Sequence, residues 1–87
     1  MEKENRFETV AVMWEKLTKR EKEAVERICE YPVLYYSDHA EAMHIAVHTF
    51  DAHVKAARLK SGAESKLHLY AIFAEYIAHL HEQDPKD

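Results

Sequence analysis

The chain has 87 residues, of which 47% are apolar and 32% charged, and its formal net charge at pH 7 is −4. A chain of this length can bury one hydrophobic core, so we expect one domain. Its single cysteine, Cys29, cannot close an internal disulfide, and no run of about 20 apolar residues could span a membrane. The charged start of the chain lacks the apolar segment of a signal peptide, so we expect a cytoplasmic protein that does not associate with membranes.

Residues that form turns are scarce in this sequence. It holds one glycine, Gly62, and two prolines, Pro32 and Pro85. β-hairpins need more turn residues than this, and runs of β-branched residues are also few. The sequence therefore predicts an all-α fold.

The first segment, residues 1–16, allows two interpretations. Its apolar residues, among them Phe7, Val10 and Trp14, could form an extra amphipathic helix, or the segment could be an extended arm. The next element starts more clearly, because Thr18 and Glu21 have the spacing of a capping box. We expect a helix over residues 18–30, ended by Pro32, whose ring removes an amide donor.

A short helix and a long helix are expected in the middle of the chain. Residues 33–36 form a loop whose aromatic side chains cover the core, and Ser37 is a suitable N-cap for a helix that ends at Met43. Residues 44–47 then form a turn, with Ile45 pointing inward. A second helix is expected over 47–60, since Phe50, Val54 and Ala57 recur on one helical face, and Gly62 follows as a left-handed cap.

The last predicted helix runs from Ser65 to Glu82, and residues 83–87 form a polar tail. Its apolar residues are more numerous than one buried stripe needs. The surplus favours a second apolar face for a partner, which we expect to be a second copy of the chain. The residues assigned to this homodimer interface are Leu69, Tyr70, Phe73, Tyr76, Ile77 and Leu80.

Two helices joined by a tight turn, the second of them long, are typical of a helix-turn-helix unit. The stretch 17–23, LTKREKE, resembles the start of the LuxR/GerE-type DNA-binding domain. The stretches 45–54, IAVHTFDAHV, and 60–69, KSGAESKLHL, resemble its recognition helix and the beginning of its dimerising helix. The resemblance covers roughly residues 17–74. It implies a LuxR/GerE-like domain of four to five helices over 17–82, preceded by the arm or extra helix of residues 1–16.

The resemblance implies a small bacterial transcriptional regulator that binds double-stranded DNA as a dimer, with the helix at 47–60 in the major groove. By position, Asp51, Ala52 and Lys55 would reach base edges, while Thr49 and His53 would support the backbone contacts. The residues expected to contact DNA are His48, Thr49, Asp51, Ala52, Lys55, Arg58, Lys19 and Arg20. No cofactor is implied.

A second function stays open because of the charge of the chain and two departures from the family pattern. Asp51 stands where a cation or polar donor is usual, and Ala46 replaces a serine N-cap, which weakens the recognition helix by about 1 kcal/mol. Residues 44–68 hold four lysines and arginines against two acids, a local balance of +2 in an acidic chain. The alternative is an acidic helix-turn-helix protein without DNA binding that acts by sequestering another regulatory protein.

Neither catalysis nor metal binding is expected. No nucleophile motif or glycine-rich phosphate loop is present, and Cys29 lies on an apolar helix face, where an inert thiol is the commoner case. His44 and His48 are four residues apart, but no cysteine or carboxylate stands at ligand spacing to them. Protonation of all seven histidines would change the formal charge from −4 to +3, so we expect DNA affinity to rise in mild acid.

Overall fold

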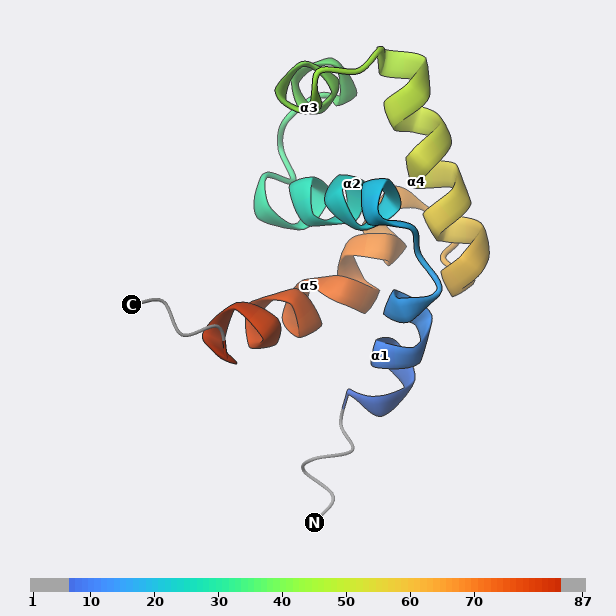
Figure 1. The fold of residues 1–87 in the computed structure, drawn as a ribbon, viewed down its shortest axis with the longest axis vertical. Coiled ribbons are helices and arrows are strands. Elements are labelled where there is room, and N and C mark those ends of the chain that lie inside the picture. The colour runs from blue at the N-terminus through green and yellow to red at the C-terminus, as the bar shows by residue number, and fades with distance from the viewer. Residues whose placement is uncertain (1–6, 84–87) are drawn as a thin grey trace.

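The computed structural model describes residues 7–83, and five α-helices account for most of that range (Figure 1). They are α1 (Glu8–Glu15), α2 (Lys19–Glu30), α3 (Tyr36–Met43), α4 (Val47–Ser61) and α5 (Lys66–Gln83). No strand occurs between residues 7 and 83, so the predicted all-α fold is confirmed. The predicted polar tail lies outside the described residues, apart from Gln83 at the end of α5.

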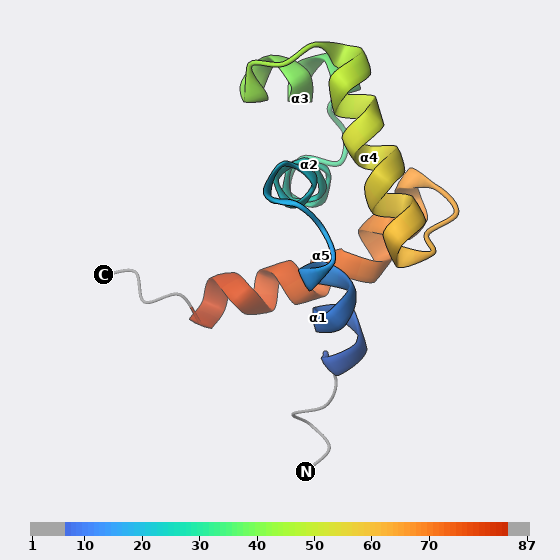
Figure 2. The same cartoon turned by 45° about the vertical axis from the view of Figure 1, so that its right-hand side comes forward.

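The helix α2 lies at the centre of the molecule. It packs against α5 on one side and against α4 and α3 on the other, and α4 extends along one edge from α3 toward α5 and α1 (Figures 1 and 2). The short α3 packs mainly on α4. The short α3 therefore lies at one end of the molecule and α1 and α5 at the other, and α4 runs between the two ends.

The N-terminal segment is helical from Glu8 to Glu15, which decides between the two interpretations left open by the sequence. This helix packs on α5 through aromatic contacts, with Trp14 and Phe73 ring centroids 5.3 Å apart and Phe7 and Tyr76 centroids 5.5 Å apart. Trp14 is buried in the same core as the other helices. The helix α1 is thus part of the domain rather than a separate arm.

The capping box predicted at the start of α2 is confirmed. The Thr18 hydroxyl accepts a hydrogen bond from the Glu21 amide at 3.2 Å, and the Glu21 carboxylate accepts one from the Thr18 amide at 2.9 Å. Two amides that the helix itself cannot bond are satisfied in this way. The helix ends at Glu30, two residues before Pro32, as the sequence predicts.

The start of α3 differs from the prediction. The helix begins at Tyr36, with Tyr35 as its N-cap, so the expected cap at Ser37 is wrong. Asp38 causes the difference, because its carboxylate accepts a hydrogen bond from the Tyr35 amide at 3.1 Å and fixes the first turn there. Of the two tyrosines expected to cover the core, Tyr36 packs edge-on against Phe50 and Tyr35 is exposed.

The residues on either side of α4 determine where this helix begins and ends. His44 has a left-handed backbone, with φ of 60°, and this ends α3 and turns the chain toward α4. Ala46 is the N-cap of α4 and makes no side-chain capping bond. Gly62 ends the helix with φ of 77°, as predicted, because glycine adopts this backbone conformation without a steric penalty.

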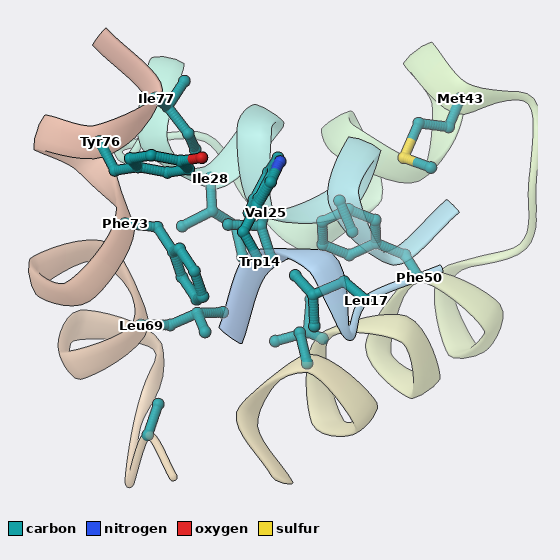
Figure 3. Packing of buried hydrophobic residues seen from close by; sticks show 14 of the residues in the cluster. Trp14, Leu17, Val25, Ile28, Met43, Phe50, Leu69, Phe73, Tyr76 and Ile77 are labelled. Atoms are coloured by element: carbon teal, nitrogen blue, oxygen red, sulfur yellow. The ribbon is translucent and has the colours of Figure 1, made fainter. Parts of the chain in front are cut away.

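The apolar residues of α5 meet two different neighbours within one chain. One side of the helix packs on α2 and α4, and another side meets α1. Figure 3 shows Phe73 and Leu69 of α5 beside Trp14, Val25 and Ile28. Intramolecular packing therefore accounts for the apolar surplus that the sequence analysis assigned to a second copy.

None of the helices between residues 7 and 83 has the length and apolar character needed to cross a lipid bilayer.

Candidate nucleic-acid interface

One long side of α4 faces solvent, and most residues expected to contact DNA lie along it. The side chain of Lys55 is 68% exposed. His48 and Ala52 are exposed as well, while Thr49 and Asp51 are partly buried. The helix has 15 residues and is therefore about 22 Å long. This surface is available to a partner, and no other helix of the described chain covers Lys55.

The central charges of this surface neutralise each other. Lys55 Nζ lies 3.2 Å from Asp51 Oδ2, one helical turn away. Lys55 is well exposed and Asp51 is partly exposed, so the pair is held weakly and can open when a partner offers better contacts. In the free protein, however, the middle of α4 carries no net charge.

Arg58 is engaged in holding the turn between α4 and α5. Its Nη2 donates a hydrogen bond of 2.7 Å to the carbonyl of Glu64, and its own carbonyl accepts from the Ala63 amide at 3.0 Å. The Nε of Arg58 is buried and has no hydrogen-bond partner among the described residues. Arg58 is therefore a structural residue in the free protein, unlike the exposed Lys55.

Lys19 and Arg20, expected to contact the DNA backbone, lie at the start of α2. Arg20 forms an ion pair with Glu23 and donates a hydrogen bond of 3.1 Å to the carbonyl of Met43. It thereby satisfies a carbonyl at the end of α3 that the helix leaves unbonded. Lys19 is exposed. The start of α2 is thus hydrogen-bonded to the end of α3, next to the turn that precedes α4.

The residues assigned to a dimer interface do not form an outer face. Tyr76 is only 8% exposed, and Leu69, Phe73 and Ile77 are also buried in the core of one chain. Tyr70 and Leu80 are half-buried. The physical reason is the position of α1, which covers the side of α5 that the sequence analysis left for a second copy.

A different side of α5 is open to solvent. Leu67, Ala71 and Ala78 are exposed and share one face of the helix with the exposed Glu75, since successive members of this set are three or four residues apart. Beside Leu67, an apolar groove of about 510 Å³ runs between the end of α2 and the start of α5. Its lining residues are Ile28, Pro32, Ser65, Lys66, Leu67 and Tyr70.

Two residue pairs near the candidate interface were not found by sequence reasoning. Lys60 Nζ lies 2.7 Å from Glu21 Oε1 and joins the end of α4 to the start of α2. Arg27 Nε donates a hydrogen bond of 3.2 Å to Nδ1 of His39, which is fully buried behind α4. Neither pair has a local spacing that could have revealed it, because the partners lie on different helices.

Possible metal ligands among the described residues do not gather in one place, and Cys29 is half-buried. No group of three or more histidine, cysteine, aspartate or glutamate side chains within residues 7–83 could hold a metal ion. Burial, followed by the charges of Glu26 and Glu30, raises the pKa of the Cys29 thiol to about 12. The thiol is therefore protonated at neutral pH and unreactive as a nucleophile.

Comparisons with protein-family models, with curated proteins and with solved structures find no match to this chain.

Proposed function

We propose that the chain is a transcriptional regulator that binds double-stranded DNA through a helix-turn-helix of LuxR/GerE type. In this proposal α3 and α4 are the two helices of the unit, and α4 enters the major groove. The observation that carries the proposal is that one side of α4 faces solvent. This helix follows the short α3 after a tight turn, in which His44 has a left-handed backbone. The major groove is wide enough to admit one α-helix, and α4 stands at an edge of the molecule where it could enter.

The charges near α4 fit a weak, salt-sensitive contact with DNA. Residues 44–68 carry four lysines and arginines against two acids, so this segment is positive although the chain is acidic. On DNA, the Asp51 carboxylate would be repelled by phosphates, but it can accept a hydrogen bond from a cytosine amino group. The Asp51–Lys55 pair would then open, and Lys55 would turn to a phosphate or a guanine.

Dimerisation belongs to the same proposal, but on a different surface from the one expected. A second copy would pack on the exposed face of α5 that carries Leu67, Ala71 and Ala78, with the exposed Glu75 among them. Small side chains let two helices approach closely, and the apolar groove beside Leu67 would be covered at the same time. The variant Ala71→Glu tests this surface by sedimentation, because a charge there should yield monomers without disturbing the core. A wild-type chain that sediments as a monomer contradicts the dimer.

A salt titration of duplex binding tests the proposed function. Fluorescence anisotropy with a labelled duplex pool should show binding at low salt that weakens steeply as salt rises, because phosphate contacts release counterions. Lys55→Ala should reduce the slope of log affinity against log salt concentration by about one, as expected for the loss of one phosphate contact. Lys16→Ala is the matched control, since Lys16 is an exposed lysine at the end of α1, outside the α3–α4 unit, and it should leave the slope unchanged.

A second candidate function is a regulator that sequesters another regulatory protein through the same helix. Two observations favour it: Asp51 neutralises Lys55, and Leu59 of α4 is an apolar side chain that is 82% exposed. An exposed large apolar group is more useful to a protein interface than to a phosphate backbone. If no duplex binds even at low salt, the DNA proposal is rejected and this candidate takes its place.

A further inference from the structure

A fully buried histidine of α3 connects this helix to α2 and α4. His39 lies in the second turn of α3 and has no exposed surface. Its ring stacks on Phe50 of α4, with the ring centroids 5.1 Å apart and the planes inclined by 17°. Its Nδ1 accepts a hydrogen bond of 3.2 Å from Arg27 Nε of α2. One imidazole therefore contacts α2 and α4 from α3.

These contacts require the imidazole to be neutral. Because the Arg27 Nε–H donates to Nδ1, that nitrogen must carry a lone pair, and the ring proton must reside on Nε2. The Nε2 atom is buried and has no hydrogen-bond partner among the described residues. A second proton would have to go to Nδ1, where it would point at the donor and the positive charge of Arg27. Within residues 7–83, no carboxylate bonds to Nε2 to compensate for that charge.

The charged groups around His39 act mostly against a second proton. Arg27 approaches from α2, and Lys66 of α5 lies over the ring of Tyr36, three residues before His39, at 5.5 Å from the ring centroid. Asp38, on α3 itself, is the one acid that favours the charged form, but it is exposed and bonded to the Tyr35 amide. Burial, then Arg27 and Lys66, lower the pKa of His39 from its ordinary value of 6.5.

We propose that His39 makes the α3–α4 unit sensitive to pH, because only its neutral ring can hold α3 against both α2 and α4. In mild acid the protonated imidazole leaves its site between Arg27 and Phe50, and α3 separates from α2. The turn at residues 44–46 and the start of α4 then lose their support. This effect does not depend on the proposed function, and its direction is opposite to the gain in affinity expected from protonation of surface histidines.

The sign of the effect follows from proton linkage. The unfolded chain binds a proton at His39 with the ordinary pKa, while the folded chain binds it only at lower pH. The unfolded state therefore holds more protons in mild acid, and stability falls as pH drops below about 6.5. For each pKa unit by which the folded value of His39 lies below the unfolded value, full protonation decreases the folding equilibrium constant tenfold.

The experiment compares two glutamine variants with the wild type in urea unfolding at about pH 5.5 and about pH 8. In His39→Gln, the amide oxygen can still accept from Arg27, but the side chain does not titrate. His48→Gln is the matched control, since it removes an exposed histidine of α4. We expect His39→Gln to lose much of the acid-induced decrease in the unfolding midpoint, and His48→Gln to retain it. The same decrease in His39→Gln as in the wild type overturns the proposal.

A titration of the histidine rings by NMR decides the question in the wild-type chain, even if His39→Gln does not fold. The expected result is a His39 ring that takes up its proton below its ordinary pKa of 6.5, together with faster amide exchange in α3 than in α5 as it does so. A His39 ring that titrates at or above its ordinary pKa of 6.5 overturns the proposal.

Discussion

Lys60 and Glu21 join the end of α4 to the start of α2, with Nζ and Oε1 2.7 Å apart. The Glu21 carboxylate is almost fully buried, and it also accepts the Thr18 amide at 2.9 Å. One carboxylate therefore completes the cap of α2 and fastens the far end of α4. This ion pair positions α4 relative to the core, so its removal should affect stability more than removal of an exposed ion pair.

The variant Lys60→Met tests this contribution. Methionine preserves the length of the side chain but removes the charge, and the buried Glu21 carboxylate loses one hydrogen bond. We expect the free energy of unfolding to fall by about 1–2 kcal/mol, since a hydrogen bond to a charged group contributes about 1.5–3 kcal/mol and Lys60 is partly solvated. Lys55→Met, on the same helix, removes an exposed ion pair and should cost less than about 0.5 kcal/mol. Equal losses in urea denaturation of the two variants would contradict the structural role of Lys60.

Acid should weaken the same link. Burial by itself raises the pKa of Glu21, but hydrogen bonds from Lys60 and from the Thr18 amide outweigh it and hold the pKa below its ordinary value of 4.5. The folded chain therefore binds fewer protons at Glu21 than the unfolded chain does, and this contribution is present above about pH 4.5 and lost as pH falls. We expect unfolding free energies measured between about pH 5 and pH 3 to fall less steeply for Lys60→Met than for the wild type. Parallel curves would mean that Lys60 does not perturb Glu21.

The packing of α1 on α5 leads to a third prediction. Trp14 is buried against Phe73, so Trp14→Ala should leave a cavity and lower the free energy of unfolding by about 3 kcal/mol. Val12→Ala, on the exposed side of the same helix, should change it by less than about 0.5 kcal/mol. Because Trp14 is the only tryptophan in the chain, unfolding should be followed by far-ultraviolet circular dichroism rather than by fluorescence. A small effect of Trp14→Ala would show that α1 is not part of the folded domain.

Local patterns predicted the helices well, because the residues that start and stop them are close in sequence. Thr18 with Glu21 and the single Gly62 mark helix ends within a few positions, and the structure confirms both. The start of α3 was missed by two residues, since the Asp38 carboxylate competes with the Ser37 hydroxyl as the capping group. Such competition is decided by backbone geometry, which the sequence does not show.

The contacts between helices, and the surfaces that these contacts cover, could not be predicted in the same way. The apolar residues of α5 indicate burial, but a sequence pattern does not show whether α1 or a second copy covers them. Lys60 looks like any solvated lysine until the fold brings it to Glu21, 39 positions away. Likewise, His39 has no local feature that marks it as buried, and only the packing of α3 on α2 and α4 places it beside Arg27.

The N-cap of α4 offers a stabilising substitution. Ala46 has φ of −74° and ψ of 154°, the backbone conformation of an N-cap, but its methyl group cannot accept a hydrogen bond. In Ala46→Ser the hydroxyl can accept from a free amide of the first turn, and the residue is exposed, so no packing is lost. We expect the free energy of unfolding to rise by about 0.5–1 kcal/mol. Ala52→Ser, at an exposed position inside the same helix, should lower it slightly, because serine is a poorer helix former than alanine. If urea denaturation shows no gain for Ala46→Ser, the first turn of α4 is already satisfied by other groups, and the missing cap does not weaken this helix.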